Sequence, residues 1–596
     1  MDRKSLIVLA SSFALLFLWF WIVPKIYPPI PKPISTNLVT TATSPAAATN
    51  AATNAITLPP PTASAVPTNL AAPLVAPGSP EQVEKLETGD AVYTFTSHGG
   101  GLKLVELKKY PITSSRGPST KAGSNEVATL NHRALVPVLA VRGNDVVAGD
   151  NLYKLTKTSA TSLRAEKLLP NGLAVVKDFR FTSNFLLAAS VRLENRADQA
   201  VTVPEYAVAA GTSSLMEPEE AERFLSVYWF GGVKAEKVDP GWFDNTSFMG
   251  CLGGTSVPRP LFTANASNLL WSAVPNQFFT LAVMGSTNNA ASQLKVLRVE
   301  LPPDPRSRVR QPHNYGYEAS LIYPGAVLAP GQAVERRYTL YAGPKEYRSL
   351  ARIAPELDAV MDFGMFHWFA KALLLSMNVL YQLVPNYGLV IILITVIIKL
   401  LFWPLTQAST RSMKRMQQLQ PQMKALQEKY KDDPMKQQKK LMEFMKENKV
   451  SPLGGCLPMM LQIPVFIGFY TMIQSAIELR GVRFLWAYDL SKPDTVAYLP
   501  GLDFPVNLLP LVMGATMLWQ ARMTPPSPGM DPTQQKIMKY MPMMFMVFLY
   551  NFSAGLTLYW TVQNLLTIAQ MKLTKAQDPA TAAKPAAPVA PLKKKK

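Results

Sequence analysis

Hydrophobic side chains run almost without interruption from residue 388 to residue 405. At about 1.5 Å of rise per residue, an α-helix of this length crosses most of the hydrocarbon core of a bilayer. One charged side chain, Lys399, interrupts the run, and Thr395 lies four residues before it on the same helix face. A charge in mid-span costs about 2.5 to 3.5 kcal/mol. The pattern therefore predicts a membrane span whose Thr395 and Lys399 face a hydrated cavity or a bundle interior.

Lys399 also has a simpler interpretation. It lies about 10 Å of helix rise from Thr406, where the span is expected to end. A lysine side chain can reach from such a depth to the interface and act only as an anchor. Its position alone leaves both interpretations open.

Other apolar runs predict further spans. The run near the amino end follows Arg3 and Lys4 and lacks small residues at a cleavage spacing, so it is interpreted as an uncleaved signal anchor. Lysines close the chain, which places the tail in the cytoplasm by the positive-inside rule. The six predicted spans are 1–24, 388–405, 453–475, 503–521, 537–552 and 554–572.

Short runs of alternating polar and apolar residues fill residues 85–345, which predicts one large all-β sandwich outside the cytoplasmic membrane. Residues 191–194 and 201–203 predict the two strands of a hairpin, and 297–301 and 337–340 predict strands with one buried face. No cluster of carboxylates or histidines in this region supports a catalytic or sugar-binding role.

The remaining segments are connections with distinct compositions. Residues 25–84 are rich in Pro, Ala and Thr, which predicts an extended tether. Residues 346–387 are predicted to form a linker and an interfacial amphipathic helix. The predicted loops and tail are 476–502 outside the membrane, 522–536 in the cytoplasm, and the basic cytoplasmic tail 573–596.

Residues 406–452 carry many lysines and arginines, so they are predicted to form a cytoplasmic helical hairpin. Asp433 and Pro434 are a good cap and first residue for the second helix. Apolar residues at spacings of three and four predict a seam that packs within the hairpin or binds variable apolar partners. The seam residues are Met413, Met416, Leu419, Met423, Leu426 and Tyr430.

Composition supports a membrane protein, because 48% of the residues are hydrophobic and only 17% are charged. The net charge is +20, and the distribution of the basic residues fits the predicted membrane topology better than a nucleic-acid-binding pattern. The two cysteines and four histidines show no metal-ligand spacing, and no nucleotide or nucleophile motif occurs. We therefore expect no enzymatic activity, no metal, no cofactor and no small-molecule substrate.

Polar residues recur along one face of the last predicted span. Such stripes often hold neighbouring helices together, but with Lys399 this one also fits the wall of a water-filled groove. The stripe comprises Thr557, Trp560, Thr561, Asn564 and Thr567, and Gln462 adds a polar group from the span 453–475. Six methionines of the predicted spans would instead form an apolar surface. They are Met459, Met460, Met541, Met543, Met544 and Met546.

Four ordered motifs resemble the YidC/Oxa/Alb family of membrane protein insertases, in its Gram-negative form with a large periplasmic domain. The motifs are residues 451–458, 462–466, 531–538 and 555–560. The resemblance implies a polytopic α-helical membrane protein with a periplasmic all-β super-sandwich and a cytoplasmic helical hairpin. Of its six spans, five would form a conserved core around a hydrophilic groove that opens to the cytoplasm and to lipid.

The implied function is to insert integral membrane proteins and help them fold and assemble, alone or with the Sec translocon. The implied groove residues are Lys399, Thr395, Gln462, Thr557, Trp560, Thr561 and Asn564, and the six methionines above would form an apolar slide for substrate helices. Lys399 stands where the family usually has arginine, and Trp560 where it usually has tyrosine. Lysine keeps the charge but loses the planar donor fork.

The resemblance also implies cytoplasmic partners, the ribosome and the signal-recognition-particle receptor, together with membrane lipids. The implied recruitment residues are Arg411, Lys414, Arg415, Lys439, Lys440, Lys593, Lys594, Lys595 and Lys596. The expected location is the bacterial inner membrane, with both chain ends in the cytoplasm.

Two other functions remain as alternatives. A small-solute transporter would bury a lone cation but should show paired repeats, and no second segment resembles 388–405. An intramembrane hydrolase would need a serine facing Lys399, whereas Ser475 and Ser553 lie at the predicted outer ends of their spans.

Overall fold

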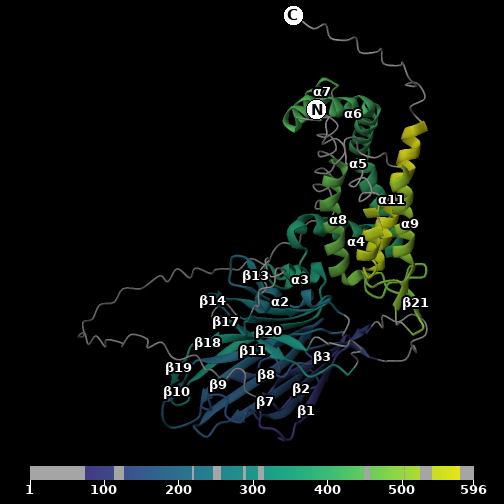
Figure 1. Ribbon diagram of the computed structural model, residues 1–596. Helices are drawn as coiled ribbons and strands as arrows, with labels where there is room; N and C mark the ends of the chain where they lie inside the picture. The colour runs from purple at the N-terminus through teal and green to yellow at the C-terminus, as the bar shows by residue number, and fades with distance from the viewer. Residues whose placement is uncertain are drawn as a thin grey trace, which may run out of the picture. The chain divides into compact units, whose positions relative to one another are not determined.

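The computed structural model describes residues 74–112, 126–217, 220–245, 257–285, 290–305, 314–431, 433–448, 457–501, 504–523, 540–541 and 543–576 (Figure 1). The predicted amino-terminal anchor, most of the predicted tether and Lys593 to Lys596 lie outside these residues. The chain divides into a β unit that ends at Asp362 and a helical unit that begins at Phe363. Each unit is described here by itself.

The β unit is built from antiparallel sheets. The nine-stranded sheet has the order β13 (Ala235–Val238), β12 (Val227–Phe230), β15 (Trp271–Pro275), β16 (Phe279–Gly285), β20 (Ala333–Pro344), β9 (Leu186–Asn195), β8 (Leu173–Ser183), β7 (Ser162–Leu168) and β6 (Lys154–Ser159). The five-stranded sheet has the order β14 (Leu261–Leu269), β17 (Ala291–Glu300), β18 (Tyr315–Tyr323), β11 (Tyr206–Ser213) and β5 (Val141–Arg142).

Two smaller sheets complete the unit. They are β1 (Val83–Glu87), β2 (Ala91–Thr96), β3 (Gly101–Pro111) and β4 (Val127–Leu130), and the pair β10 (Val201–Val203) and β19 (Ala326–Leu328). Short helices are η1 (Glu222–Phe224), α2 (Pro240–Asp244), α3 (Tyr347–Ile353) and η4 (Leu357–Met361). The described part of this region is therefore largely β, as its alternating sequence predicts.

The strand β11 shows why the two largest sheets hold together. All eight of its residues are buried, because β11 contacts β15 and β16 of the nine-stranded sheet with one face. Strands covered on both faces lose the polar alternation of half-exposed strands. By contrast, β20 alternates buried and exposed residues from Arg336 to Leu340, which agrees with the prediction for residues 337–340.

The predicted hairpin of residues 191–203 is wrong. β9 pairs with β8 and β20, whereas β10 leaves the sheet and pairs with β19. The buried Asn195 side chain directs this separation, since its Nδ2 donates to the carbonyls of Gln199 and Leu328 at 2.8 Å each. Alternation fixes which face of a strand is buried but leaves the choice of partner to long-range contacts.

A carboxyl group ties two loops of the β unit together. Glu220 Oε2 accepts from Met216 N at 2.8 Å and Oε1 accepts from Gln277 N at 2.5 Å. Burial raises the pKa of Glu220 to about 7, although these two hydrogen bonds and the nearby Lys345 oppose the rise. Folding therefore favours the protonated carboxyl, and stability should fall as the pH rises from about 4.5 to about 7.

We accordingly expect the β unit of the full-length protein in detergent to melt at a lower temperature at pH 7 than at pH 5. The Glu220→Gln variant should lose much of this pH dependence, which is on the order of 2 to 3 kcal/mol. Asp198→Asn, at an exposed carboxylate, serves as the control. An unchanged pH profile in the Glu220→Gln variant would contradict the assignment to Glu220.

The helical unit contains one long continuous helix that leads into the hairpin. α5 (Tyr387–Gln418) passes through Pro404 and extends beyond the predicted end of the span at residue 405. It is followed by α6 (Gln420–Lys429) and α7 (Pro434–Glu447). Asp433 caps α7, as predicted, by accepting from Lys436 N at 3.0 Å.

The hairpin seam packs on itself. Met416, Met423 and Met445 form a buried cluster, with Leu419, Leu441 and Phe444 packed against it. The side chain of Met413 lies outside the described residues. The predicted seam therefore serves the hairpin's own packing at these positions, and the helix that carries it breaks at Leu419 rather than continuing.

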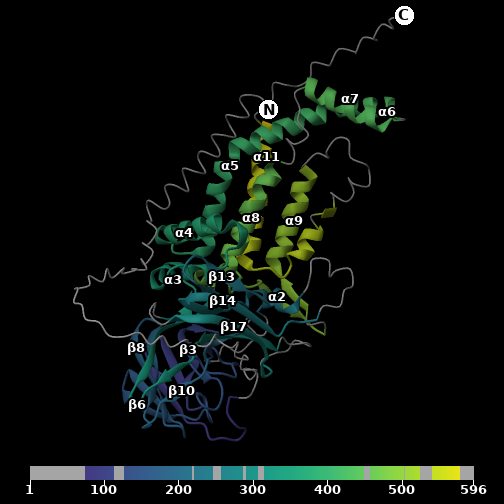
Figure 2. The same ribbon diagram turned by 90° about the vertical axis from the view of Figure 1, so that its left-hand side faces the viewer.

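The other helices of this unit are η5 (Gly364–Phe366), α4 (His367–Leu383), α8 (Leu457–Ser475), η7 (Ile477–Leu479), α9 (Leu508–Met523) and α11 (Ala554–Ala576), and β21 (Thr495–Leu499) pairs with β22 (Phe504–Asn507). Figures 1 and 2 show α5, α8, α9 and α11 side by side, with α6 and α7 across one end. α11 contacts α5, α8 and α9, so it is the common neighbour within the described bundle.

Two predicted spans have different bounds. Residues 504–507 form β22, which pairs with β21, instead of the start of a span, and the buried Asn507 Nδ2 donates to Tyr550 O at 2.8 Å. Asp494 then accepts from Leu509 N at 2.6 Å near the start of α9. In the predicted span 537–552, residues 543–548 are helical and residues 549–552 turn.

Among the described residues, one helical stretch is both long enough and apolar enough to cross a membrane, Tyr387–Gln407, with a mean hydropathy of 2.5. This stretch contains the predicted span 388–405. The count of six spans is not confirmed and stays a prediction.

Candidate functional site

Lys399 lies inside the helical unit and points its charged end at α11. Its side chain is buried, with 5% of the residue exposed. Its Nζ donates to Thr567 Oγ1 at 2.8 Å, and the Thr567 hydroxyl donates to Gln563 O at 2.7 Å. The ammonium group is thus held against the neighbouring helix instead of extending along α5 to the interface.

Thr395 does not partner Lys399. Thr395 is fully buried and its hydroxyl donates to Ile391 O, one turn earlier in its own helix, at 2.7 Å. Serine and threonine hydroxyls in helices commonly make this bond. The hydroxyl beside the ammonium is therefore that of Thr567, which belongs to the predicted stripe on the last span.

A second polar contact joins α8 to α11. Gln462 Nε2 donates to the hydroxyl of Tyr559 at 2.6 Å, and Gln563 Nε2 donates to Gln462 Oε1 at 3.2 Å. Tyr559 is buried and stacks on Phe469 with ring centroids 4.2 Å apart. Tyr559 lies outside the predicted stripe and was not among the predicted groove residues. Its hydroxyl was the available signal, since a buried tyrosine hydroxyl usually needs a partner.

The other members of the predicted stripe are enclosed by protein. Asn564 Nδ2 donates to Thr516 Oγ1 of α9 at 3.2 Å, so it ties two helices together. Thr557 and Thr561 are buried, and their hydroxyls donate to the carbonyls of Ala554 and Thr557 of α11 itself, at 3.1 and 2.7 Å. Asn564 thus fits the interpretation of polar residues as contacts between helices.

Trp560 occupies an aromatic cluster. Its ring meets that of Phe466 edge to face with centroids 4.7 Å apart, and lies 5.8 Å from that of Phe545. It is half-buried. The indole therefore lies between α8 and the helical residues 543–548.

The methionines of the predicted apolar slide differ in their exposure. Met543 and Met544 are 46% and 65% exposed, and Val547 and Phe548 beside them are each 70% exposed. Met546 instead packs against Gly514 of α9, in space that any larger side chain at Gly514 would need. Met541 is half-buried, and the side chains of Met459 and Met460 lie outside the described residues. Exposed apolar side chains on this scale suit a lipid or protein partner.

The predicted recruitment residues are only partly described. Lys439 is exposed on α7, and Lys440 pairs with Glu443 at 2.6 Å. Arg411, Lys414 and Arg415 lie on α5, but their side chains are outside the described residues.

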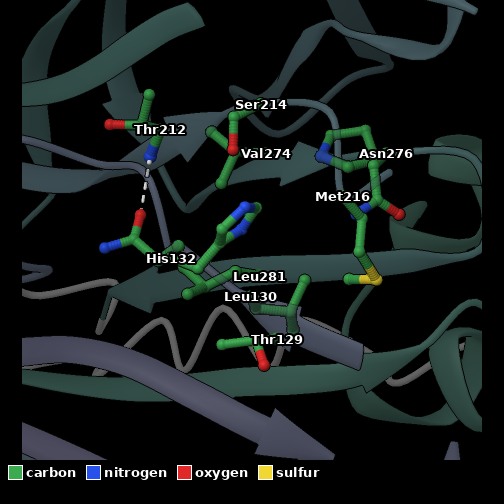
Figure 3. A pocket seen from close by; sticks show the side chains of 11 residues that line it. Thr129, Leu130, His132, Thr212, Ser214, Met216, Val274, Asn276 and Leu281 are labelled. Carbon is green, nitrogen blue, oxygen red and sulfur yellow. Dashed lines mark hydrogen bonds between the residues drawn. The ribbon is translucent and has the colours of Figure 1, made fainter. Parts of the chain in front are cut away.

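Among the described residues, the β unit contains a small cavity and a larger one. The first has a volume of about 10 Å³, enough for about one water molecule, and Figure 3 shows its lining residues, including His132, Thr212 and Asn276. The second has a volume of about 140 Å³ and is mainly apolar, with Tyr206 and Arg336 in its wall. No group of three or more His, Cys, Asp or Glu suited to a metal occurs among the described residues.

Two family models match almost the whole described chain. Residues 85–375 match the YidC periplasmic domain, and residues 379–581 match the 60Kd inner membrane protein. The first match covers the β unit, and the second covers the helices that surround Lys399.

Relatives match over most of their length. The membrane protein insertase YidC of Citrifermentans bemidjiense is 34% identical over 498 residues, which cover 81% of this chain and 83% of the relative. That of Pelobacter propionicus is 33% identical over 525 residues, covering 86% of this chain and 90% of the relative. A crystal structure of an active YidC insertase is 17% identical with a TM-score of 0.33, and covers 83% of this chain and 93% of that chain. On the family models and the two relatives, the chain belongs to the YidC family, whose inner membrane proteins carry a periplasmic domain.

Proposed function

We propose that this protein is a membrane protein insertase that inserts integral membrane proteins and helps them fold, through a hydrophilic groove that contains Lys399. Membership of the YidC family and the names of the relatives support the activity. The observation that carries the role of Lys399 is its ammonium group, buried inside the helical unit and held by Thr567.

The surroundings of this ammonium group suit the binding of an anion. In the part of the chain that the structure describes, Lys399 makes one hydrogen bond, to Thr567, and no salt bridge. An ammonium group has three N–H donors, so two remain for a ligand. A buried cation in a membrane segment is strongly stabilised by a carboxylate, because the local dielectric constant is low. Acidic side chains in the translocated tail of a substrate are the fitting ligand.

The outer surface suits the apolar part of a substrate. The exposed Met543, Met544, Val547 and Phe548 form an adaptable apolar patch. In this proposal the substrate's own helix contacts the patch while its polar tail enters the groove. Both contacts lower the barrier to moving polar groups across the hydrocarbon core.

The topology of the proposal follows the sequence. We place the β unit in the periplasm, six spans in the membrane, and the hairpin and both chain ends in the cytoplasm. The Sec translocon, the ribosome and the signal-recognition-particle receptor are proposed partners. Arg411, Lys414, Arg415, Lys439, Lys440 and Lys593 to Lys596 are proposed to meet the cytoplasmic partners or anionic lipid.

The alternative functions receive no support. The relatives are named as insertases and not as transporters. A hydrolase would need a serine bonded to Lys399, and the bond seen among the described residues goes to Thr567 instead.

Reconstitution tests the proposed activity. The full-length protein should be placed in proteoliposomes and given a single-span protein with a short translocated amino-terminal tail. We expect protease-protected tail to accumulate well above the level in protein-free liposomes. Equal protection with and without the protein would refute the proposed function.

A further inference from the structure

In the part of the chain that the structure describes, a single hydrogen bond, to Thr567, links the ammonium group of Lys399 to the rest of the bundle. The two residues are 168 positions apart in the chain and lie on α5 and α11. A lysine side chain has four flexible bonds and ends in a compact ammonium group. Without a fixed partner, such a group samples many positions, and each encounter with a substrate would have to order it.

We propose that Thr567 is the positioning residue for Lys399, and that it holds the ammonium group where two N–H donors stay available to a substrate carboxylate. This inference rests on the insertase function proposed above and adds a residue to the same site. Thr567 does not touch the substrate. It acts by restricting the ammonium group before the substrate arrives.

The geometry at Thr567 supports this role. Its hydroxyl hydrogen is committed to Gln563 O at 2.7 Å, so the lone pairs of Oγ1 are left to accept from Lys399 Nζ at 2.8 Å. A threonine hydroxyl that donates to its own helix has a fixed direction, since β-branched side chains have few rotamers. The acceptor for the ammonium group is therefore itself held in place.

A second contact braces the same turn of α11. The side chain of Gln563 donates to Gln462 of α8 at 3.2 Å, and Gln462 donates to Tyr559 at 2.6 Å. The residue whose carbonyl fixes the Thr567 hydroxyl is thus tied to a third helix. Lys399 is positioned through a chain of contacts that crosses from α5 to α11 and on to α8.

The competing explanation is that Thr567 only holds two helices together, as polar residues in membrane helices often do. The two roles differ in their dependence on the charged group. If Thr567 positions the cation, losing its hydroxyl should impair the insertion of acidic tails when residue 399 is the flexible lysine. The loss should be smaller when residue 399 is arginine, because its planar fork presents five donors and is already organised.

The test is a double-mutant cycle in proteoliposomes with the full-length protein. Thr567→Val keeps the shape of the side chain and removes the hydroxyl. We expect insertion of a substrate with an acidic translocated tail to fall about tenfold, the scale of one lost hydrogen bond to a charged group. Insertion of the same substrate with a neutral tail should change less than about twofold, and Thr567→Ser should restore acidic-tail insertion.

In the Lys399→Arg background, the same Thr567→Val change should reduce acidic-tail insertion by less than about twofold, so the two substitutions should be non-additive. Thr471→Val is the matched control, because among the described residues the Thr471 hydroxyl donates only to carbonyls of its own helix, at 3.0 and 3.2 Å. This control should insert both substrates normally.

Two results would overturn the positioning role while leaving the insertase function standing. One is an equal loss for acidic and neutral tails, or an equal loss in the lysine and arginine backgrounds, which would assign Thr567 to helix packing. The other is normal acidic-tail insertion by Thr567→Val in a preparation where Lys399→Met is defective. Failure of the unmodified protein to insert any substrate would instead refute the proposed function itself.

Discussion

Replacing Lys399 with methionine is expected to reduce insertion of substrates with acidic translocated tails by more than about tenfold. Methionine matches the length of the lysine stem and removes the charge, so helix packing should survive. A hydrogen bond to a charged group contributes about 1.5 to 3 kcal/mol, and its loss raises the barrier only for substrates that carry the carboxylate. Initial rates of protease-protected tail formation, measured for acidic and neutral tails in parallel, provide the comparison.

Two variants control this prediction. Lys399→Arg keeps the charge and should retain most of the activity. Lys572→Met removes an exposed charge on the same α11 that carries Thr567, and should leave both substrates unaffected. Equal insertion of acidic and neutral tails by the Lys399→Met variant would contradict an electrostatic role for Lys399.

The Arg142→Ala change is expected to lower the free energy of unfolding of the β unit by about 3 to 5 kcal/mol. Arg142 Nη1 lies 2.6 Å from Glu318 Oε1, and both side chains are buried, at 6% and 3% exposure. Burial raises the pKa of Glu318, while the charge of Arg142 opposes that rise. Removing only the arginine leaves an uncompensated buried carboxylate, which is the costly case.

Urea unfolding of the full-length protein in detergent, followed by the intrinsic fluorescence of its tryptophans, which include the buried Trp271, measures this loss. The matched control is Arg164→Ala at the half-exposed pair with Asp178, where the expected loss is below about 1 kcal/mol. Replacing both Arg142 and Glu318 by leucine should recover much of the stability. Equal small losses at the two arginines would show that the buried pair is not a stability element.

Local sequence patterns were sufficient to predict features that depend only on residues close together in the chain. The apolar run around Lys399 is long enough to predict a helix at membrane scale, and the structure places α5 there. The alternation in residues 337–340 correctly predicts a half-buried strand. Asp433 correctly predicts the start of α7, because a capping side chain bonds to a backbone group only three residues away.

Tertiary structure decided the features that depend on partners distant in the chain. Alternation at 191–203 could not show that β9 pairs with β20 and β10 with β19, because pairing depends on which strands meet. Nor could spacing along α5 identify the partner of Lys399. A helical period places Thr395 on the same face, but its hydroxyl is used by its own helix, and the ammonium group instead meets Thr567 on α11.

The sequence by itself determined that a cation lies within an apolar helix and that a β-rich region and a basic hairpin flank it, since periodicity and charge are local properties. The partner of that cation and the division of the polar stripe of α11 between helix contacts and Lys399 came only from the packed bundle. Helices separated by many residues meet there, and each polar side chain takes whichever donor or acceptor the neighbouring helix presents.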